Sequence, residues 1–497
     1  MSRIKNLNFY TACLRAIILN ALFTLLLLCS AIGTTFAQSG KRPVIIIPGI
    51  TGSQIVSPET GKTVWFSFGF SRDEPDDLRL PISPNLRQNK DSLVVKDIIR
   101  EIKLPGVLKV FPEIGVYGNA LDALKAKGYT EGDWDNPKAS DVYYIFAYDW
   151  RRDNVESAQA LIEKIEAVKA KLNRPDLKFD LLAHSMGGLI ARYAAMYGKA
   201  DLLGGGRVPK LTWAGSRHIH KILLFGVPNQ GSFSAFEVLT KGYSIAGRKL
   251  PFVLDLGPDD VFSIPSLYQM LPYSSSARFY NENLKPIQVD LYKPASWRKY
   301  GWGALSDAKF LGKLKDADSI PGVKKLDWKI RNNDDKLLSE TTYREAQAFL
   351  AAALSRAKSF QQALNVSVAQ SPVEILAYGS ECEPTLSGVI LVHDAKKNVW
   401  KTLVDPDKLK TPAGREITKE EMSKVMLSEG DGRVTRNSFL PAASNRVKKS
   451  LMTTIFPVKS SFFFCAEHQK LLNDENIQNT FLTQLIDEPA DNSNIQK

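Results

Sequence analysis

The feature that most constrains this chain is a serine placed between a buried strand and a helix. The segment Leu181–Gly188 reads LLAHSMGG and overlaps the strand expected from Phe179 to Ala183. A serine on a sharp strand-to-helix turn needs small residues two positions before and after it, because larger side chains would clash. Ala183 and Gly187 occupy these positions. The pattern predicts that Ser185 is a nucleophile; the alternative is a buried serine at an ordinary strand–helix junction.

Apolar runs typical of buried strands alternate along the chain with segments of helical spacing. Strands are expected at residues 41–47, 142–148, 179–183, 222–227 and 373–378, and helices at 116–127, 154–172 and 187–197. Such alternation predicts an α/β fold, in which helices cover both faces of a mostly parallel central sheet.

Two stretches are too long to be ordinary loops of such a fold. Residues 53–115 separate the first strand from the first helix, and residues 233–372 separate the fourth and fifth strands. We interpret them as a lid and a cap over one end of the sheet. The core is then expected at 38–232, with the lid inside it, and at 373–487, followed by a polar tail at 488–497.

Residues 1–37 have the pattern of a secretory signal peptide. Basic residues come first, the apolar run Ala16–Cys29 follows, and Thr35–Ala37 resembles a small-x-small cleavage site before Gln38. The apolar run is shorter than the roughly 20 residues that span a bilayer, which favours cleavage over a membrane anchor. We therefore expect an exported protein, secreted or periplasmic.

Export would leave two cysteines in the mature chain, Cys382 and Cys465. In an oxidising compartment an even pair is compatible with one disulfide. Two unpaired buried thiols are the alternative, and the sequence leaves both open.

The formal net charge of the chain is +12. A positive excess favours contact with anionic lipid or another acidic surface. Nucleic-acid binding is not expected, because the sequence has no basic cluster interleaved with aromatic residues.

A serine nucleophile needs a general base, and the chain has five histidines. On this type of fold the nucleophile is followed along the chain by an acid and then by the base. His184 adjoins Ser185 and is expected to point away from it. His218 and His220 precede the fourth strand and are interpreted as polar residues at the end of a loop.

The two remaining histidines differ in their expected surroundings. His468 follows the apolar run Ser461–Cys465 and precedes an expected last helix, which is where the base should lie. His393 lies within Val389–Asp394, which is interpreted as a hairpin strand. We therefore assign the base to His468.

The acid should lie between the fifth strand and His468, where a carboxylate can orient the imidazole. Asp431 lies in the segment EGDGRV, whose flanking glycines permit a tight turn that aims a carboxylate inward. An ordinary solvated turn is the other interpretation of this segment. Chain order favours Asp431 as the acid, with Glu381 as the alternative.

An oxyanion hole needs two backbone N–H groups that face the developing negative charge. Met186 is expected to supply one, because it directly follows the nucleophile. The other is expected from the glycine-containing loop Pro48–Gly52 after the first strand. We assign it to Ile50, with Thr51 as the alternative.

Further motifs follow the order found in one known family. They are PVIIIPGITGS (43–53), YDWR (148–151), AHSMGG (183–188), GVPNQGS (226–232), SLYQMLP (266–272), YGSECEPT (378–385), EGDGRV (429–434) and EHQKLL (467–472). In these motifs the chain resembles the lecithin–cholesterol acyltransferase family, which includes lysosomal phospholipase A2 and phospholipid–diacylglycerol acyltransferases. HSMGG is shared by many lipases, whereas YDWR together with SLYQMLP is far more specific.

The resemblance implies an α/β-hydrolase fold with the triad Ser185, Asp431 and His468, and neither a metal nor an organic cofactor. It implies a lipid ester substrate, water or an alcohol as acceptor, and contact with a membrane or lipid surface. Asp149 and Arg151 of YDWR are expected to pair and brace the site. The alternatives are an esterase, thioesterase or amidase of the same fold, or a non-catalytic lipid-binding protein.

Two features depart from the family pattern. Animal members close a lid loop with a disulfide, but residues 53–115 contain no cysteine, and Arg433 makes the acid's segment more basic than the usual GDGTV. The lid contains the aromatic segment Val64–Phe70. Its Trp65 and Phe66 are interpreted either as lipid contacts or as core residues, and the sequence does not distinguish these.

Overall fold

The computed structural model describes residues 40–65, 78–101, 117–204, 206–243, 256–327, 330, 333–368, 370–411, 414–441 and 456–486. The predicted signal peptide, the polar tail and Phe66 lie outside these residues. Within the described ranges, no helix is both long and apolar enough to cross a bilayer.

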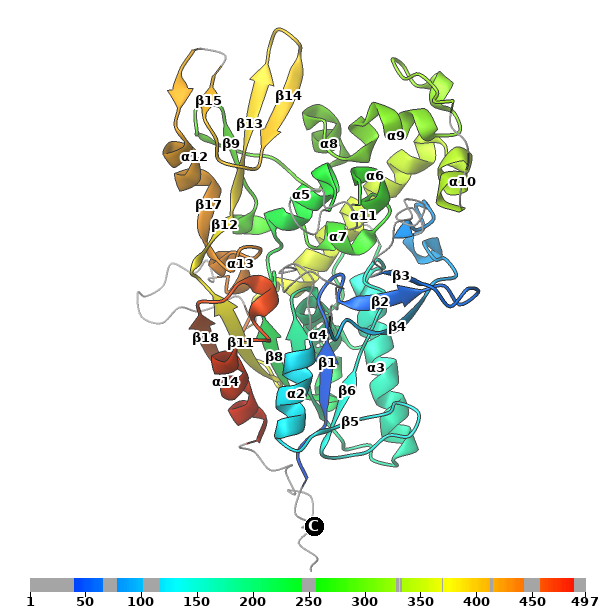
Figure 1. Cartoon of the computed structure of the whole chain (residues 1–497), viewed down its shortest axis with the longest axis vertical. Coiled ribbons are helices and arrows are strands. Elements are labelled where there is room, and N and C mark those ends of the chain that lie inside the picture. Colours follow the sequence, from blue (N-terminus) through cyan, green and yellow to red (C-terminus); the bar gives the residue numbers. More distant parts are fainter. Residues whose placement is uncertain are drawn as a thin grey trace, which may run out of the picture.

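A seven-stranded sheet forms the centre of the molecule (Figure 1). Its strand order is β18-β11-β8-β7-β1-β6-β5, and neighbouring strands pair in parallel. The strands are β1 (Val44–Ile47), β5 (Thr130–Glu131), β6 (Val142–Ile145), β7 (Phe179–His184), β8 (Ile219–Phe225), β11 (Glu374–Ser380) and β18 (Ser460–Phe464). The predicted parallel α/β sheet is confirmed.

One strand starts earlier than the apolar run suggested. β8 begins at Ile219, so His220 lies inside the strand rather than at the end of a loop. Its Nδ1 lies 2.7 Å from Oδ1 of Asp180 on the neighbouring strand β7. This cross-strand polar pair interrupts the apolar pattern and explains why the strand start was misplaced.

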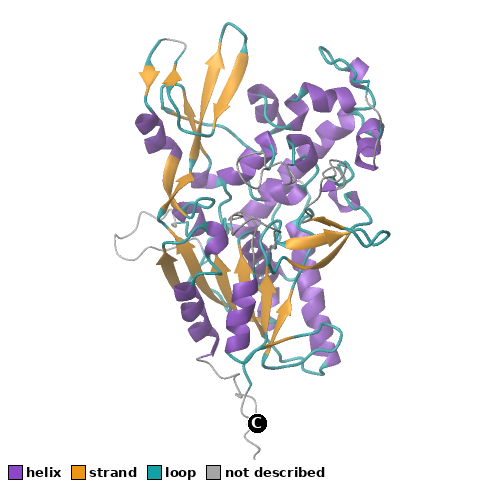
Figure 2. Ribbon diagram, viewed as in Figure 1, coloured by secondary structure: helices purple, strands orange, loops and turns teal. Residues whose placement is uncertain are grey.

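Helices cover both faces of the sheet (Figure 2). They are α2 (Gly118–Ala126) and α14 (Glu475–Ile486) on one face, and α3 (Asn154–Lys171) and α4 (Met186–Tyr197) on the other. Strand β1 shows why: Val44 and Ile46 pack in the cluster with α2 and α14, while Ile45 and Ile47 pack with α3 and α4. Successive side chains of a strand point to opposite faces, so an all-apolar strand needs cover on both sides.

The cap lies beyond the carboxyl ends of the strands (Figure 1). Its helices are α5 (Phe233–Lys241), α6 (Pro258–Val261), α7 (Pro265–Gln269), α8 (Pro294–Tyr300), α9 (Ala308–Lys313), α10 (Asn333–Glu340) and α11 (Tyr343–Leu364). A four-stranded sheet of order β10-β9-β13-β14 adjoins them. Its strands are β9 (Arg278–Asn281), β10 (Pro286–Ile287), β13 (Gly388–Asp394) and β14 (Val399–Leu403).

This second sheet joins strands from the predicted cap and from the predicted second core part. β13 comes from the predicted second core part, but it pairs in parallel with β9 of the cap. The chain therefore returns to the cap after β11. The pairing covers one edge of β9 and buries Val389 beside Phe279 in the main hydrophobic core.

The remaining strands and helices are short. Strands β12 (Glu383–Leu386) and β17 (Leu427–Gly430) pair with each other, as do β15 (Leu409–Lys410) and β16 (Glu416–Ile417). Helices α12 (Lys419–Met426) and α13 (Arg436–Phe439) flank β17 in the chain.

The described part of the lid forms a small antiparallel sheet of order β3-β2-β4. Its strands are β2 (Ser53–Val56), β3 (Thr63–Trp65) and β4 (Val94–Ile98). Trp65 is fully buried; its ring packs edge-on to Trp150, and its Nε1 donates to the carbonyl of Thr51 at 2.8 Å. Trp65 is therefore a core residue, and the lipid-contact interpretation of this side chain is wrong.

Candidate active site

Ser185 sits on the sharp turn that the sequence predicts. It follows β7, precedes α4, and has φ 52° and ψ −125°. A non-glycine residue at positive φ is strained, so the surroundings must impose it. The N–H of Ser185 donates to the carbonyl of Phe225, and a Cβ at Gly187 would lie 2.5 Å from the carbonyl oxygen of Pro48. The small residue is required because the helix start packs directly against the loop after β1.

His468 lies beside Ser185. It follows β18 in the chain, is 6% exposed, and places Nε2 2.9 Å from Oγ of Ser185. Its Nδ1 lies 2.7 Å from Oδ2 of Asp431. A carboxylate only accepts hydrogen bonds, so in the neutral ring Nδ1 carries the proton and Nε2 can accept the serine proton.

Asp431 is aimed inward by a tight turn. Its Oδ1 accepts the N–H groups of Arg433 at 2.9 Å and Val434 at 2.7 Å, and the side chain is nearly fully buried. Gly432 has φ 88°, and a Cβ at Gly430 would lie 2.4 Å from the carbonyl oxygen of Val434. The flanking glycines permit this turn, which is an inward one rather than a solvated surface turn.

The other candidates lie elsewhere. His393 is on β13, where its ring faces Trp400 with the ring centroids 4.6 Å apart. Glu381 pairs with Arg436 at 3.0 Å. The structure thus brings together Ser185, His468 and Asp431, the three residues that chain order selects.

Two N–H groups were predicted to form the oxyanion hole. Met186 is the first residue of α4, and the first N–H groups of a helix have no partner within the helix and carry its positive end. Ile50 and Thr51 both line the cavity at Ser185, so the choice between them remains a prediction.

The cavity at Ser185 has a volume of about 110 Å³ and lies between the sheet and the cap. His468 and the loop after β1 contribute to the end near Ser185. Polar groups there include Ser232 and Ser234, whose hydroxyls donate to the carbonyl of Arg433. The cap contributes an apolar wall: Ala235, Val238, Leu256, Val261, Ile264, Leu267 and Met270. This arrangement suits an apolar chain attached to a reacting carbonyl.

Arg151 pairs with Asp149 as the sequence predicts. It is fully buried, and it donates to Asp149 through Nε at 2.9 Å and Nη2 at 2.8 Å. It also donates to Asp91 of the lid at 2.6 and 2.9 Å, a contact that sequence reasoning missed because the two residues are 60 positions apart.

Across the described ranges, no group of three or more His, Cys, Asp or Glu side chains could hold a metal ion.

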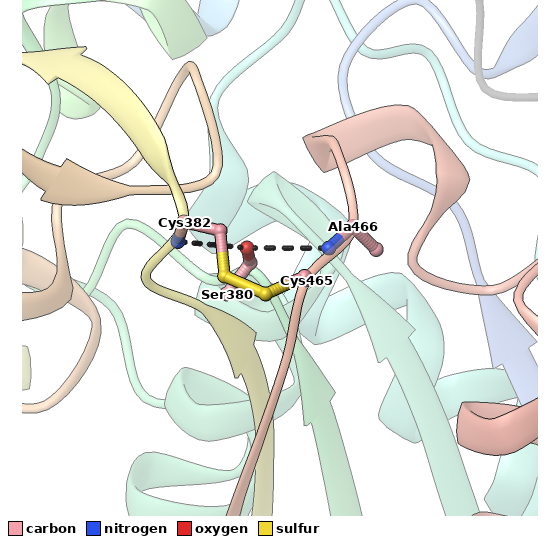
Figure 3. The surroundings of a disulfide bond; sticks show 4 residues. All are labelled: Ser380, Cys382, Cys465 and Ala466. Atoms are coloured by element: carbon pink, nitrogen blue, oxygen red, sulfur yellow. Dashed lines mark hydrogen bonds between the residues drawn. A yellow bond between two sulfur atoms is a disulfide. The ribbon is translucent and has the colours of Figure 1, made fainter.

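Cys382 and Cys465 form a disulfide (Figure 3). It joins the segments that follow β11 and β18, and the hydroxyl oxygen of Ser380 lies between the N–H groups of Cys382 and Ala466, at 3.5 and 3.4 Å. Cys465 precedes His468 by three residues. The bond resolves the alternative that the sequence left open, and it anchors the loop that carries the histidine.

We expect loss of this disulfide to destabilise the protein. It spans 83 positions, and in the chain-entropy model a loop of this length contributes roughly 4.5 kcal/mol. The double variant Cys382→Ser/Cys465→Ser should therefore unfold at a clearly lower guanidinium concentration. Non-reducing peptide mapping of the unchanged protein should show one linked pair; free thiols at both positions would contradict the structure.

His184 contacts the surroundings of the site, including the residue proposed as the base. Its Nε2 lies 3.1 Å from the carbonyl oxygen of His468, and its Nδ1 lies 3.0 Å from the hydroxyl of Tyr117. Burial lowers the pKa of His184 to about 3, so the ring is neutral. No sequence signal marked this role, because adjacency to Ser185 says nothing of what the ring contacts.

The lowered pKa predicts how stability depends on pH. Between about pH 3 and pH 6.5 the unfolded chain protonates His184 whereas the folded chain does not, so the free energy of unfolding falls as pH falls through this window. Denaturant unfolding at pH 7 and pH 4.5 should show this loss, and it should be smaller in His184→Gln. An equal loss in both proteins would contradict the prediction.

The sequence of the chain also matches the model of one protein family. The lecithin:cholesterol acyltransferase model matches residues 116–439, about two thirds of the chain. The chain belongs to this family. The matched range includes Ser185 and Asp431, while His468 and the loop after β1 lie outside it. Membership in the lecithin:cholesterol acyltransferase family confirms the resemblance seen in the sequence and indicates acyl transfer or hydrolysis on lipid esters.

Several solved structures match the chain at low identity and with TM-scores below 0.5. A crystal structure of a Tle4–Tli4 complex is 14% identical and covers 90% of this chain and 99% of that chain, with a TM-score of 0.44. The mature lipase BlEst2 of Bacillus licheniformis is 11% identical (90% and 92% covered, TM-score 0.31). EstA of Clostridium botulinum is also 11% identical (92% and 89% covered, TM-score 0.31). No curated protein matches the chain significantly.

The fold is the predicted α/β-hydrolase fold. A parallel sheet carries a serine at the turn from β7 into α4, and an aspartate and a histidine follow later in the chain. In this family member, long insertions then form the lid and cap above the carboxyl ends of the strands (Figure 1).

Proposed function

We propose that this protein transfers an acyl group from a lipid ester through an acyl-enzyme on Ser185. The observation that supports this most is the hydrogen-bonded triad of Ser185, His468 and Asp431 at the end of an apolar cavity. All three side chains are almost fully buried, which excludes competing water from the triad.

The steps follow from the positions of these groups. His468 Nε2 takes the proton of the Ser185 hydroxyl as Oγ attacks the ester carbonyl carbon. Asp431 holds the ring and stabilises its charged form. The N–H groups of Met186 and Ile50 stabilise the oxyanion. His468 then gives its proton to the departing alcohol oxygen, and an ester of Ser185 remains.

The acceptor decides the name of the reaction. Attack by water on the acyl-enzyme gives a free fatty acid and a lipase or phospholipase activity. Attack by an alcohol gives a new ester and an O-acyltransferase activity. Family membership favours an ester donor over a thioester or an amide, which the triad alone would also accept.

The test is incubation with phospholipid vesicles that contain a sterol or a long-chain alcohol, followed by separation of fatty acid from new ester. Formation of new ester that is lost in Ser185→Ala would make the protein an acyltransferase. Fatty acid alone, again lost in that variant, would make it a phospholipase. If neither product depended on Ser185, the proposal would be wrong.

We also propose contact with an anionic lipid surface through the β13–β14 hairpin, which projects from the cap (Figure 1). Val399 on this hairpin is 51% exposed, and the neighbouring Lys396, Lys397 and Lys401 are exposed. An exposed aliphatic side chain among lysines is complementary to a lipid surface that carries negative headgroups.

The charge-reversal variant Lys396→Glu/Lys397→Glu should weaken binding to vesicles that contain phosphatidylglycerol several-fold. It should leave hydrolysis of a soluble short-chain ester unchanged. The matched control reverses Lys125 and Lys127, two exposed lysines at the far end of α2, and should bind normally. Co-sedimentation with the vesicles measures the binding of both charge-reversal variants. Equal binding by the two variants would exclude the hairpin as the docking element.

Export is the remaining part of the proposal. The leader pattern of residues 1–37 supports it, and a disulfide is typical of proteins in oxidising compartments. N-terminal sequencing of protein recovered outside the cytoplasm should begin at Gln38. A chain that begins at Met1 would contradict cleavage.

A further inference from the structure

A row of buried hydrogen bonds close to Ser185 takes no part in the proposed steps of acyl transfer. The N–H of Gly49 lies 2.8 Å from the hydroxyl oxygen of Tyr117, which lies 3.0 Å from Nδ1 of His184. On the other side of the ring, Nε2 of His184 lies 3.1 Å from the carbonyl oxygen of His468. The row therefore runs from the loop after β1 to the backbone of the proposed base.

Each proton in this row has one possible position. The carbonyl oxygen of His468 can only accept, so Nε2 of the neutral His184 carries the ring proton and donates. Nδ1 of His184 is then the acceptor of a hydrogen bond that the hydroxyl of Tyr117 donates. The hydroxyl oxygen in turn accepts the N–H of Gly49. Every bond points the same way along the row, from Gly49 to His468.

Both ends of the row touch the reaction site. Gly49 directly precedes Ile50, and a Cβ at Gly49 would lie 2.9 Å from Cβ of Ser185. At the other end, the backbone of His468 is held on two sides: its N–H donates to the carbonyl of Asp431 at 2.9 Å, and its C=O accepts from His184.

We propose that Tyr117 and His184 are positioning residues that hold the oxyanion loop and the general base in register with Ser185. The inference rests on the proposed function, because it assigns a role within that reaction. Without the row, the Gly49 N–H and the His468 carbonyl lose their partners inside a buried site. The loop and the base are then free to shift independently, and small displacements of reacting groups lower the rate strongly.

Tyr117→Phe tests the row with the smallest change, because it removes one oxygen and keeps the ring. We expect kcat for a soluble ester to fall about 10- to 100-fold while KM changes less than about twofold, since the groups that contact substrate remain. The matched control is Tyr197→Phe. Tyr197 is equally buried, and its hydroxyl donates to the carbonyl of Ala363 at 2.9 Å on another part of the core.

His184 variants separate positioning from packing. In His184→Gln the side-chain amide can still donate to the carbonyl of His468, whereas His184→Leu fills the space without donating. The glutamine variant should keep clearly more activity than the leucine variant. Adding Tyr117→Phe to His184→Leu should cost little more, because the row is already broken, and this non-additivity is measured by a double-mutant cycle.

One result would overturn the inference. If Tyr117→Phe and His184→Gln lower the melting temperature but keep kcat within twofold of Tyr197→Phe, the row is only structural. If His184→Leu does not fold, Tyr117→Phe and His184→Gln by themselves decide whether the row has a positioning role. An unchanged protein that neither hydrolyses esters nor reacts with a phosphonate would instead overturn the proposed function, and this role with it.

Discussion

Replacing Ser185 by alanine is expected to reduce kcat for any ester substrate by about 10⁴-fold or more. Within the triad of Ser185, His468 and Asp431, the serine hydroxyl oxygen is the only atom that faces the cavity as a nucleophile. Its loss therefore removes the acyl-enzyme route altogether. The change should leave the melting temperature nearly the same, because the smaller alanine side chain fits the strained turn at least as well as serine does. Initial rates with a short-chain ester measure the effect.

The matched control is Ser359→Ala. Ser359 is also buried, and its hydroxyl donates to the carbonyl of Ser355 within α11, far from the triad in the chain. This variant should keep the activity of the unchanged protein. Retention of more than about one hundredth of the activity in Ser185→Ala would show that turnover does not depend on an acyl-enzyme at this residue.

Asp431→Asn is expected to lower kcat by about 10³- to 10⁴-fold with little change in fold. Oδ1 of Asp431 accepts two backbone N–H groups, from Arg433 and Val434. In an asparagine the carbonyl oxygen must take this place, so the NH₂ group faces His468. The ring then accepts at Nδ1 and is protonated at Nε2, where it can no longer receive the serine proton.

Glu381→Gln is the control for this prediction, because Glu381 was the alternative acid in the sequence. The structure pairs it with Arg436 at the surface, so its neutralisation should change kcat less than twofold. Comparison of kcat for the two variants on the same ester decides between the acids. A larger loss in Glu381→Gln than in Asp431→Asn would contradict the geometry.

The parts of the molecule that sequence analysis predicted are those that local pattern determines. The strands of a parallel sheet are buried on both faces, so β1 appears as an uninterrupted apolar run and β7 as a mainly apolar one. The small residues around Ser185 mark the turn because clashes exclude larger ones. Chain order then selected His468 and Asp431 from five histidines and several acids.

The parts that sequence analysis did not predict depend on contacts between distant segments. Nothing local shows that β13 pairs with β9 of the cap, so the sequence did not predict this second sheet. The aromatic run at Trp65 reads equally as core or as lipid contact until the packing against Trp150 is seen. Sequence analysis missed the contacts of His184, because Tyr117 and the His468 carbonyl lie 67 and 284 positions away.

The most direct test of the central claim is covalent labelling of the purified protein with an organophosphonate, followed by peptide mass spectrometry. The account predicts one phosphonate per chain, carried by Ser185, and no labelling of the Ser185→Ala variant. Absence of an adduct, or an adduct on another residue with Ser185 unmodified, would show that Ser185 is not the nucleophile.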